Sequence, residues 1–146
     1  MDTGNGAHGS MVVKTSADTA GPVLARLREG IRSRGIHEFA VIDHAAGARA
    51  VGMDLPFETV VIFGNAEVGT PLMLADARTG LDLPLRVLVR ALPAGGSEVL
   101  YDDPRGLAES FDLAPQTGVL DRLSRLLDSL TDHALAGSTG RGSDGQ

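Results

Sequence analysis

The sequence predicts an α+β fold of two layers, in which a mostly antiparallel sheet of about five strands is covered by helices. Short runs rich in β-branched residues recur along the chain, which is typical of strands. Two longer segments carry apolar residues three and four positions apart, as amphipathic helices do. Between two apolar runs, residues 93–96 (PAGG) predict the turn of a hairpin. The expected order is β-α-β-β-β-β-α, with short extra helical turns.

A strand, a helix and a second strand are predicted first. Residues 11–15 (MVVKT) form a short β-prone run, after which Asp18 can cap a helix that Gly35 ends. The apolar residues of this helix recur at helical spacing, at Val23, Leu24, Leu27 and Ile31. Residues 36–42 then have the β-branched and aromatic content of a strand.

A short helix is expected directly after this second strand. Asp43 is placed to be its N-cap, and His44 falls in its first turn. A neutral imidazole there could act as an acid or base, or bind a metal or haem iron. The commoner use of such a histidine is a structural hydrogen bond, and both readings stay open.

The segment IFGNAEVGTP, residues 62–71, contains most of a phosphate-binding Walker A loop. It follows an apolar run at 59–63 that predicts a buried strand, and it places Gly64 and Gly69 five positions apart. The lysine of a Walker A loop is missing, since Thr70 stands in its place. We therefore interpret both glycines as residues that permit a tight reversal from strand to helix.

The second half of the chain predicts a hairpin between short helical turns. Residues 71–75 suit a helical turn, and residues 85–92 suit a half-buried strand with one wholly apolar face. Residues 98–101 return as its partner. Asp102 and Asp103 precede Pro104, a combination that indicates the cap of a short helix rather than a catalytic carboxylate pair.

A long amphipathic helix is predicted from Val119 onwards. Its apolar residues lie three and four apart, at Leu120, Leu123, Leu127, Leu130 and Ala134. The same stripe could form a coiled-coil seam, but it is shorter than three heptads, which favours packing across the sheet.

The composition excludes several classes of protein. The 146 residues suit one domain, predicted at 11–135, between flexible tails at 1–10 and 136–146 that are rich in glycine. A net charge of −6 disfavours binding to nucleic acid or membrane phosphates. The absence of cysteine excludes disulfides and thiolate metal sites. No signal peptide or membrane-spanning run is visible, so a cytoplasmic location is expected.

Four blocks of sequence resemble the DUF302 family, small domains of unknown function. In order along the chain, the resemblance rests on residues 42–48 with 51–52, on 61–65 with 69–73, on 80–86 and on 101–104. Ala66 and Ala77 depart from the family pattern, in which proline is frequent at these positions. The family includes a branch with cysteines, and this chain has none. The resemblance implies a compact α+β fold that pairs into homodimers, and it implies no established catalytic residues.

Three functional hypotheses follow. The first is a dimeric domain that binds a small apolar or cofactor-like ligand, with haem as one candidate. Its candidate site residues are His44, Asp43, Asn65, Thr70, Phe63 and Met73, with Met53 and Phe57 as further wall. The second is an enzyme with His44 as general acid or base beside Asp43 or Asp82. The third is a structural or regulatory interaction module. The binding hypothesis leads, because no pattern supplies nucleophile, base and orienting group together.

Overall fold

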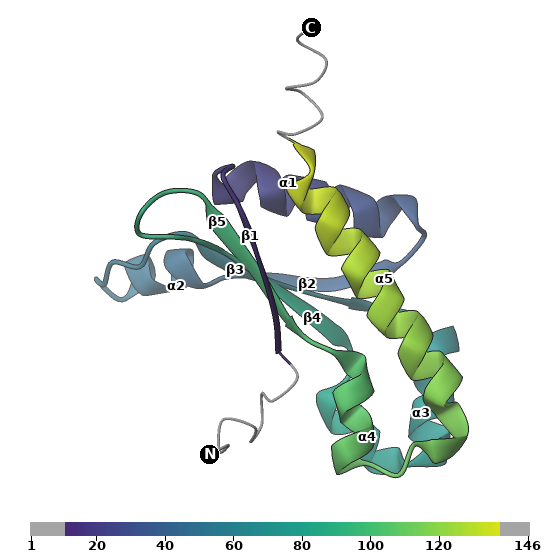
Figure 1. Cartoon of the computed structure of the whole chain (residues 1–146). Coiled ribbons are helices and arrows are strands. Elements are labelled where there is room, and N and C mark those ends of the chain that lie inside the picture. Colours follow the sequence, from purple (N-terminus) through teal and green to yellow (C-terminus); the bar gives the residue numbers. More distant parts are fainter. Residues whose placement is uncertain (1–10, 138–146) are drawn as a thin grey trace, which may run out of the picture.

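The computed structural model describes residues 11–137, so the tails predicted at 1–10 and 136–146 lie outside the described residues, apart from 136 and 137. The predicted α+β fold is confirmed (Figure 1). One five-stranded sheet has the strand order β1-β5-β4-β3-β2, and every neighbouring pair is antiparallel. The strands span Met11–Ser16 (β1), His37–Asp43 (β2), Glu58–Gly64 (β3), Leu85–Ala91 (β4) and Ser97–Asp102 (β5).

Two long helices, α1 (Ala20–Ser33) and α5 (Thr117–Leu135), pack on one face of the sheet (Figure 1). In each helix, the apolar residues whose spacing predicted it form the side that is buried. All five predicted apolar residues of α5 are buried, which confirms packing across the sheet. The core lies between these helices and the inward residues of the strands, which include Val61, Phe63, Val87, Val89, Val99 and Tyr101.

The shorter helical elements lie at the ends of the strands. They are α2 (His44–Ala50), α3 (Ala66–Ala75), α4 (Leu107–Ser110) and the 3-10 turns η2 (Ala77–Asp82), η3 (Pro104–Gly106) and η4 (Ala114–Gln116). Asp43 caps α2 and Asp103 caps η3, as predicted, by accepting from the amides of Ala46 and Arg105. Asp18 does not cap α1. Its N-cap is Thr19, and the Asp18 carboxylate instead binds Arg26 at 2.6 Å.

The opposite face of the sheet is not covered by the long helices, and we call it the open face. The strand register places five apolar residues in one row across all five strands, in the order Val13, Leu100, Leu88, Val60 and Ile42. None of the five belongs to either buried core cluster. The edge residues Val13 and Ile42 are 47% and 43% exposed.

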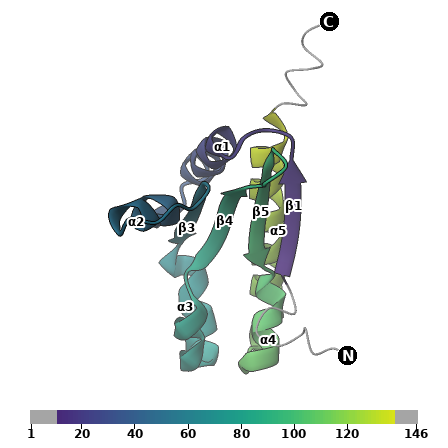
Figure 2. The same ribbon diagram turned by 90° about the vertical axis from the view of Figure 1, so that its left-hand side faces the viewer.

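Strands β4 and β5 form the predicted hairpin, but they separate at its open end. Gly95 and Gly96 have φ of 105° and 81°, a conformation that favours glycine, and they make the turn. Pairing runs from Ala91 and Ser97 only as far as Leu88 and Leu100. Beyond this pair the two strands diverge towards α3 and α4 (Figure 2).

The chain passes from strand to helix at Gly64, as predicted, but the backbone role assigned to the two glycines was wrong. Asn65 is the N-cap of α3, and Gly69 lies inside this helix. Neither Gly64 nor Gly69 has a positive φ. A Cβ on Gly69 would lie 3.7 Å from the Leu83 side chain, and one on Gly64 would lie 3.6 Å from Pro84. The glycines therefore allow close packing instead of an unusual backbone conformation.

Candidate functional site

The α3 pocket is a mostly apolar hollow of about 260 Å³ between α3 and the ends of β3 and β4. Its apolar wall comes from Phe39, Val68, Met73, Leu83, Pro84, Leu85 and Leu123. Asn65 and Thr70 are the polar residues that line it. A largely apolar hollow with a few fixed polar groups is the usual form of a small-molecule site.

Three glycines line this pocket and leave it open. The three are Gly64, Gly69 and Gly80. At each of them, a Cβ would lie within 4 Å of a neighbouring side chain. A Cβ on Gly80 would lie 3.2 Å from the Met73 sulfur, so Met73 packs over this position. The small residues thus set both the volume of the pocket and the position of its thioether.

Asn65 joins the pocket to the start of β2. Its Oδ1 accepts a hydrogen bond from the backbone N–H of His37 at 3.3 Å. The His37 ring in turn meets the edge of the Phe39 ring, with centroids 4.5 Å apart. Phe39 lies at an irregularity of β2 between Glu38 and Ala40, and it lines the pocket.

The structure brings three of the predicted site residues together: Asn65, Thr70 and Met73 all line the α3 pocket. Asp43 and His44 do not join them. Because β2 and β3 are antiparallel, Asn65 lies beside the first residue of β2, whereas Asp43 is the last. The seven residues of β2 separate the two ends by about 20 Å. A single pocket that includes His44 and Asn65 is therefore not formed.

The other predicted wall residues also lie elsewhere. Phe63 is fully buried in the core beneath the helices, and Phe57 packs against the same core. Met53 is 68% exposed. The prediction missed this arrangement because alternate residues of a strand face opposite sides, and Phe63 falls on the helix side.

A second hollow, the strand cleft, opens where β4 and β5 diverge and has a volume of about 390 Å³. Leu88 and Leu100 line it on the open face, and Tyr101 and Leu127 line it towards the helices. Arg86 on β4 and Asp102 on β5 face each other across it, 3.9 Å apart. Asp82 also lines this cleft, so it is not near His44.

The Asp76 carboxylate at the C-terminal end of α3 has a structural role. Asp76 accepts from the backbone N–H groups of Arg78 and Asp112, and it pairs with the Arg78 guanidinium at 2.9 Å. The hydrogen bond from Arg78 holds the pKa of Asp76 well below its usual range, and the Asp112 amide adds to this effect. Asp76 thereby ties η2 to the segment that precedes α5.

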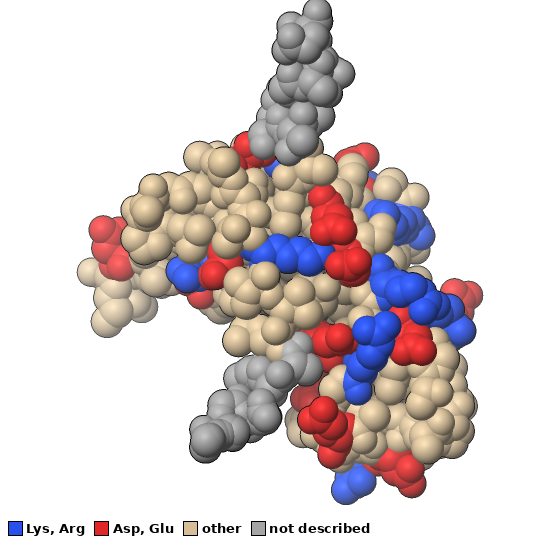
Figure 3. Space-filling model, in the orientation of Figure 1, with Lys and Arg blue, Asp and Glu red and all other residues tan. Residues whose placement is uncertain are grey.

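The described residues offer no patch of one charge on the face that carries α5, where basic and acidic side chains are interspersed (Figure 3). Within residues 11–137, no three His, Cys, Asp or Glu side chains are grouped as a metal site would require. None of the helices in that range has the length and apolar character needed to cross a membrane.

The comparisons with known proteins give partial relatives. The chain is 33% identical over 109 residues to proteins named fluoride-specific ion channel FluC 1 from Brucella suis biovar 1 (strain 1330) and Brucella abortus biovar 1 (strain 9-941). The matches cover 75% of this chain but only 43% and 40% of those proteins. The chain thus spans about two fifths of the length of the curated relatives that it matches.

A solved structure and a family model also match most of the chain. An uncharacterized conserved protein DUF302 from Bacillus stearothermophilus superposes with a TM-score of 0.75 at 13% identity, covering 86% of this chain and 98% of that one. At this identity the likeness shows the fold alone. Residues 12–130 match the model described as domain of unknown function DUF302. Because that model covers most of the chain, the protein belongs to the DUF302 family.

Proposed function

We propose that the protein is a homodimeric domain that binds a small, largely apolar molecule in the α3 pocket. The observation that carries this proposal is the pocket itself, which has an apolar wall, three lining glycines and two polar residues. Its volume of about 260 Å³ lies just below the range of about 300–1,000 Å³ that suits drug-sized ligands. The ligand class is therefore a compact molecule with one polar end directed to Asn65 or Thr70.

Haem and acid–base catalysis have less support than this binding role. Among the described residues, no histidine lines the α3 pocket or the strand cleft. His44 is solvent-exposed, and the carboxylate of its neighbour Asp43 accepts from the amide of Ala46. His44 therefore lies outside both hollows, beside a carboxylate that already caps a helix.

The pocket can be tested with two matched glycine substitutions. Gly69→Ala places a methyl group in the pocket wall, 3.7 Å from Leu83, while Gly47→Ala adds the same group to α2, with no atom within 4 Å. Both should raise helix stability, by up to about 1 kcal/mol. Titration with indole and benzene, followed by NMR chemical shifts, should show weaker binding for Gly69→Ala and unchanged binding for Gly47→Ala. Equal binding by both variants, or none by the parent protein, would refute the pocket as a site for such ligands.

The polar end of the pocket has its own test. Thr70→Val removes the hydroxyl and keeps the shape of the side chain. Binding of indole, which carries an N–H donor, should weaken relative to benzene, which has none. Unchanged binding of both probes would show that the Thr70 hydroxyl does not contact the ligand.

A second candidate role, as an accessory module of a membrane ion channel, is favoured by the partial relatives. Proteins named fluoride-specific ion channels match 109 residues of this chain, and the helices within residues 11–137 include none that could span a membrane. The shared part would then be a domain that acts beside the ion-conducting part. Amide NMR spectra in sodium fluoride and in sodium chloride test this role: fluoride-specific shifts support it, and identical spectra contradict ion sensing by the domain.

A further inference from the structure

The open face is an apolar surface of the sheet that the long helices leave uncovered. Its row of five apolar residues runs from edge to edge, and the core clusters include none of them. Val13 and Ile42 are exposed and the three central residues are half-buried. A continuous apolar row of this kind marks an interaction site more often than isolated apolar residues do.

We infer that this open face is the surface through which two copies of the chain pair, face to face, about a two-fold axis at Leu88. The inference rests on the homodimer of the proposed function and adds its interface. Leu88 lies in the middle of the row, on β4, the central strand of the sheet. A two-fold axis that superposes such a face on its copy brings the central residue against itself.

The size of the face suits a pair of copies. Five strands at a spacing of about 4.8 Å, each about 20 Å long, project to about 480 Å². The accessible surface of a side-chain-covered face is larger than its projection. Two such faces together therefore approach the lower limit of specific interfaces, about 1,200 Å² in total.

The charges around the row favour a copy of the same face over a highly charged partner. On one side, Arg90 is paired with Glu98 at 2.7 Å, and on the other, Arg86 lies 3.9 Å from Asp102. Because these two arginines already face carboxylates within the chain, they give the face little excess positive charge for nucleic acid or lipid phosphates. A second copy has the same apolar centre, and its arginines are likewise paired with carboxylates of its own chain. It can therefore meet the open face without placing an unpaired charge at the centre.

The strand cleft opens onto this face, since Leu88, Leu100 and Val60 line both. Pairing through the open face would therefore roof the cleft with the second copy. The walls of the cleft would then come from two chains.

The test introduces charge at the centre of the face and at a matched exposed leucine elsewhere. Leu88→Lys should convert the dimer to a monomer in light scattering at micromolar concentration, and so should Leu88→Glu. An equimolar mixture of the two should regain the dimer mass, because the opposite charges meet at the axis. Leu74→Lys is the control, because Leu74 is 82% exposed and lies on α3, outside the face. Circular dichroism checks that each variant is folded.

A cross-linking arm holds even if a charged variant fails to fold. The chain has no cysteine, so Leu88→Cys and Leu74→Cys each carry one thiol. A short bis-maleimide should link Leu88→Cys into covalent dimers and leave Leu74→Cys largely monomeric. A parent protein that is monomeric would overturn the homodimer and this interface together. A parent dimer that survives both charges at Leu88, with no cross-link formed by the Leu88→Cys variant, would overturn the interface alone.

Discussion

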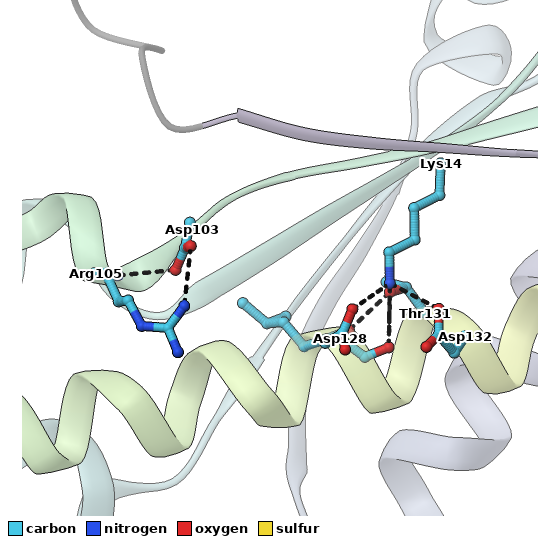
Figure 4. Close-up of polar contacts among 7 residues, drawn as sticks. Lys14, Asp103, Arg105, Asp128, Thr131 and Asp132 are labelled. Atoms are coloured by element: carbon cyan, nitrogen blue, oxygen red, sulfur yellow. Dashed lines mark hydrogen bonds and ion pairs between the residues drawn. The ribbon is translucent and has the colours of Figure 1, made fainter.

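Lys14 on β1 and Asp128 on α5 are joined by a hydrogen-bonded ion pair 2.7 Å long, although 114 residues separate them in the chain. The same ammonium group binds Asp132 at 2.8 Å and the Thr131 hydroxyl at 2.9 Å (Figure 4). Lys14 thus fastens an edge strand of the sheet to the helix that covers it. Burial works to lower the pKa of Lys14, but the hydrogen bonds to Asp128 and Asp132 outweigh it and leave that pKa raised.

The Lys14 cluster should stabilise the fold up to alkaline pH. A raised folded-state pKa means that the stabilisation is complete below the ordinary lysine value of about 10.4 and is lost as the pH rises through the folded value. Lys14→Met should cost about 1 kcal/mol at pH 7, a modest figure because both carboxylates are largely exposed. Urea denaturation from about pH 7 to about pH 11.5 should show the difference shrinking above about pH 10.4. A constant difference would contradict this role.

The Arg28–Glu38 pair should have the opposite pH dependence. It joins α1 to β2 at 2.9 Å, and its hydrogen bond lowers the pKa of Glu38. Because the pKa of Glu38 is lowered in the folded state, the pair stabilises the fold fully above the ordinary glutamate pKa of about 4.3. This stabilisation is lost as the pH falls through the pKa of Glu38 in the folded protein. Glu38→Gln should therefore cost about 0.5 kcal/mol at pH 7 and nothing at about pH 2 in thermal unfolding. The prediction fails if the cost is unchanged in acid.

Gly96 should be intolerant of alanine. Its φ of 81° suits glycine, and a Cβ there would collide with the backbone oxygen of Ser16. We expect Gly96→Ala to cost about 2–3 kcal/mol in urea denaturation. Gly47→Ala, in open space on α2, is the matched control and should be neutral or stabilising.

Alanine substitution should destabilise the fold at Asp43 but have little effect at the adjacent His44. Asp43 accepts from the Ala46 amide at 2.9 Å, so Asp43→Ala should cost about 1 kcal/mol through the lost N-cap. His44 is exposed, and His44→Ala should change the free energy of unfolding by less than about 0.5 kcal/mol. A loss of several kcal/mol for His44→Ala would show a structural role for the imidazole.

Removal of residues 1–9 and 137–146 should leave the melting temperature within about 2 °C. The apolar core and the residues packed against it lie between Val12 and Leu135. Calorimetry of the trimmed chain measures this directly. A larger drop would mean that the removed residues contribute to the folded state.

The long helices and the strands were predictable because burial repeats with their periods. Residues three or four apart in α5 are buried, and in β4 the alternate residues Val87 and Val89 are buried. The separation of Asn65 from His44 was predictable in principle, since antiparallel neighbours put successive strand ends on opposite edges. The error was to combine two strand ends without that rule.

Other features had no local pattern from which to predict them. Glycine is favoured both by positive φ and by close packing, so Gly69 in a helix could not be distinguished from Gly69 in a turn. Lys14 stands between β-forming residues, and its partners depend on how α5 crosses the sheet. The strand cleft depends on where pairing of β4 with β5 ends, which the sequence of neither strand marks.

Helix α5 is a common wall of the two hollows. Leu123 lines the α3 pocket, and Leu127, one turn later, lines the strand cleft, while Pro84 and Leu85 border both. A molecule that displaces this helix from one side changes the space on the other. Any resulting effect on affinity must be reciprocal, because the coupling free energy between two sites is the same in either direction. Under the proposed pairing, a second copy over the cleft would in this way be linked to ligand binding in the α3 pocket.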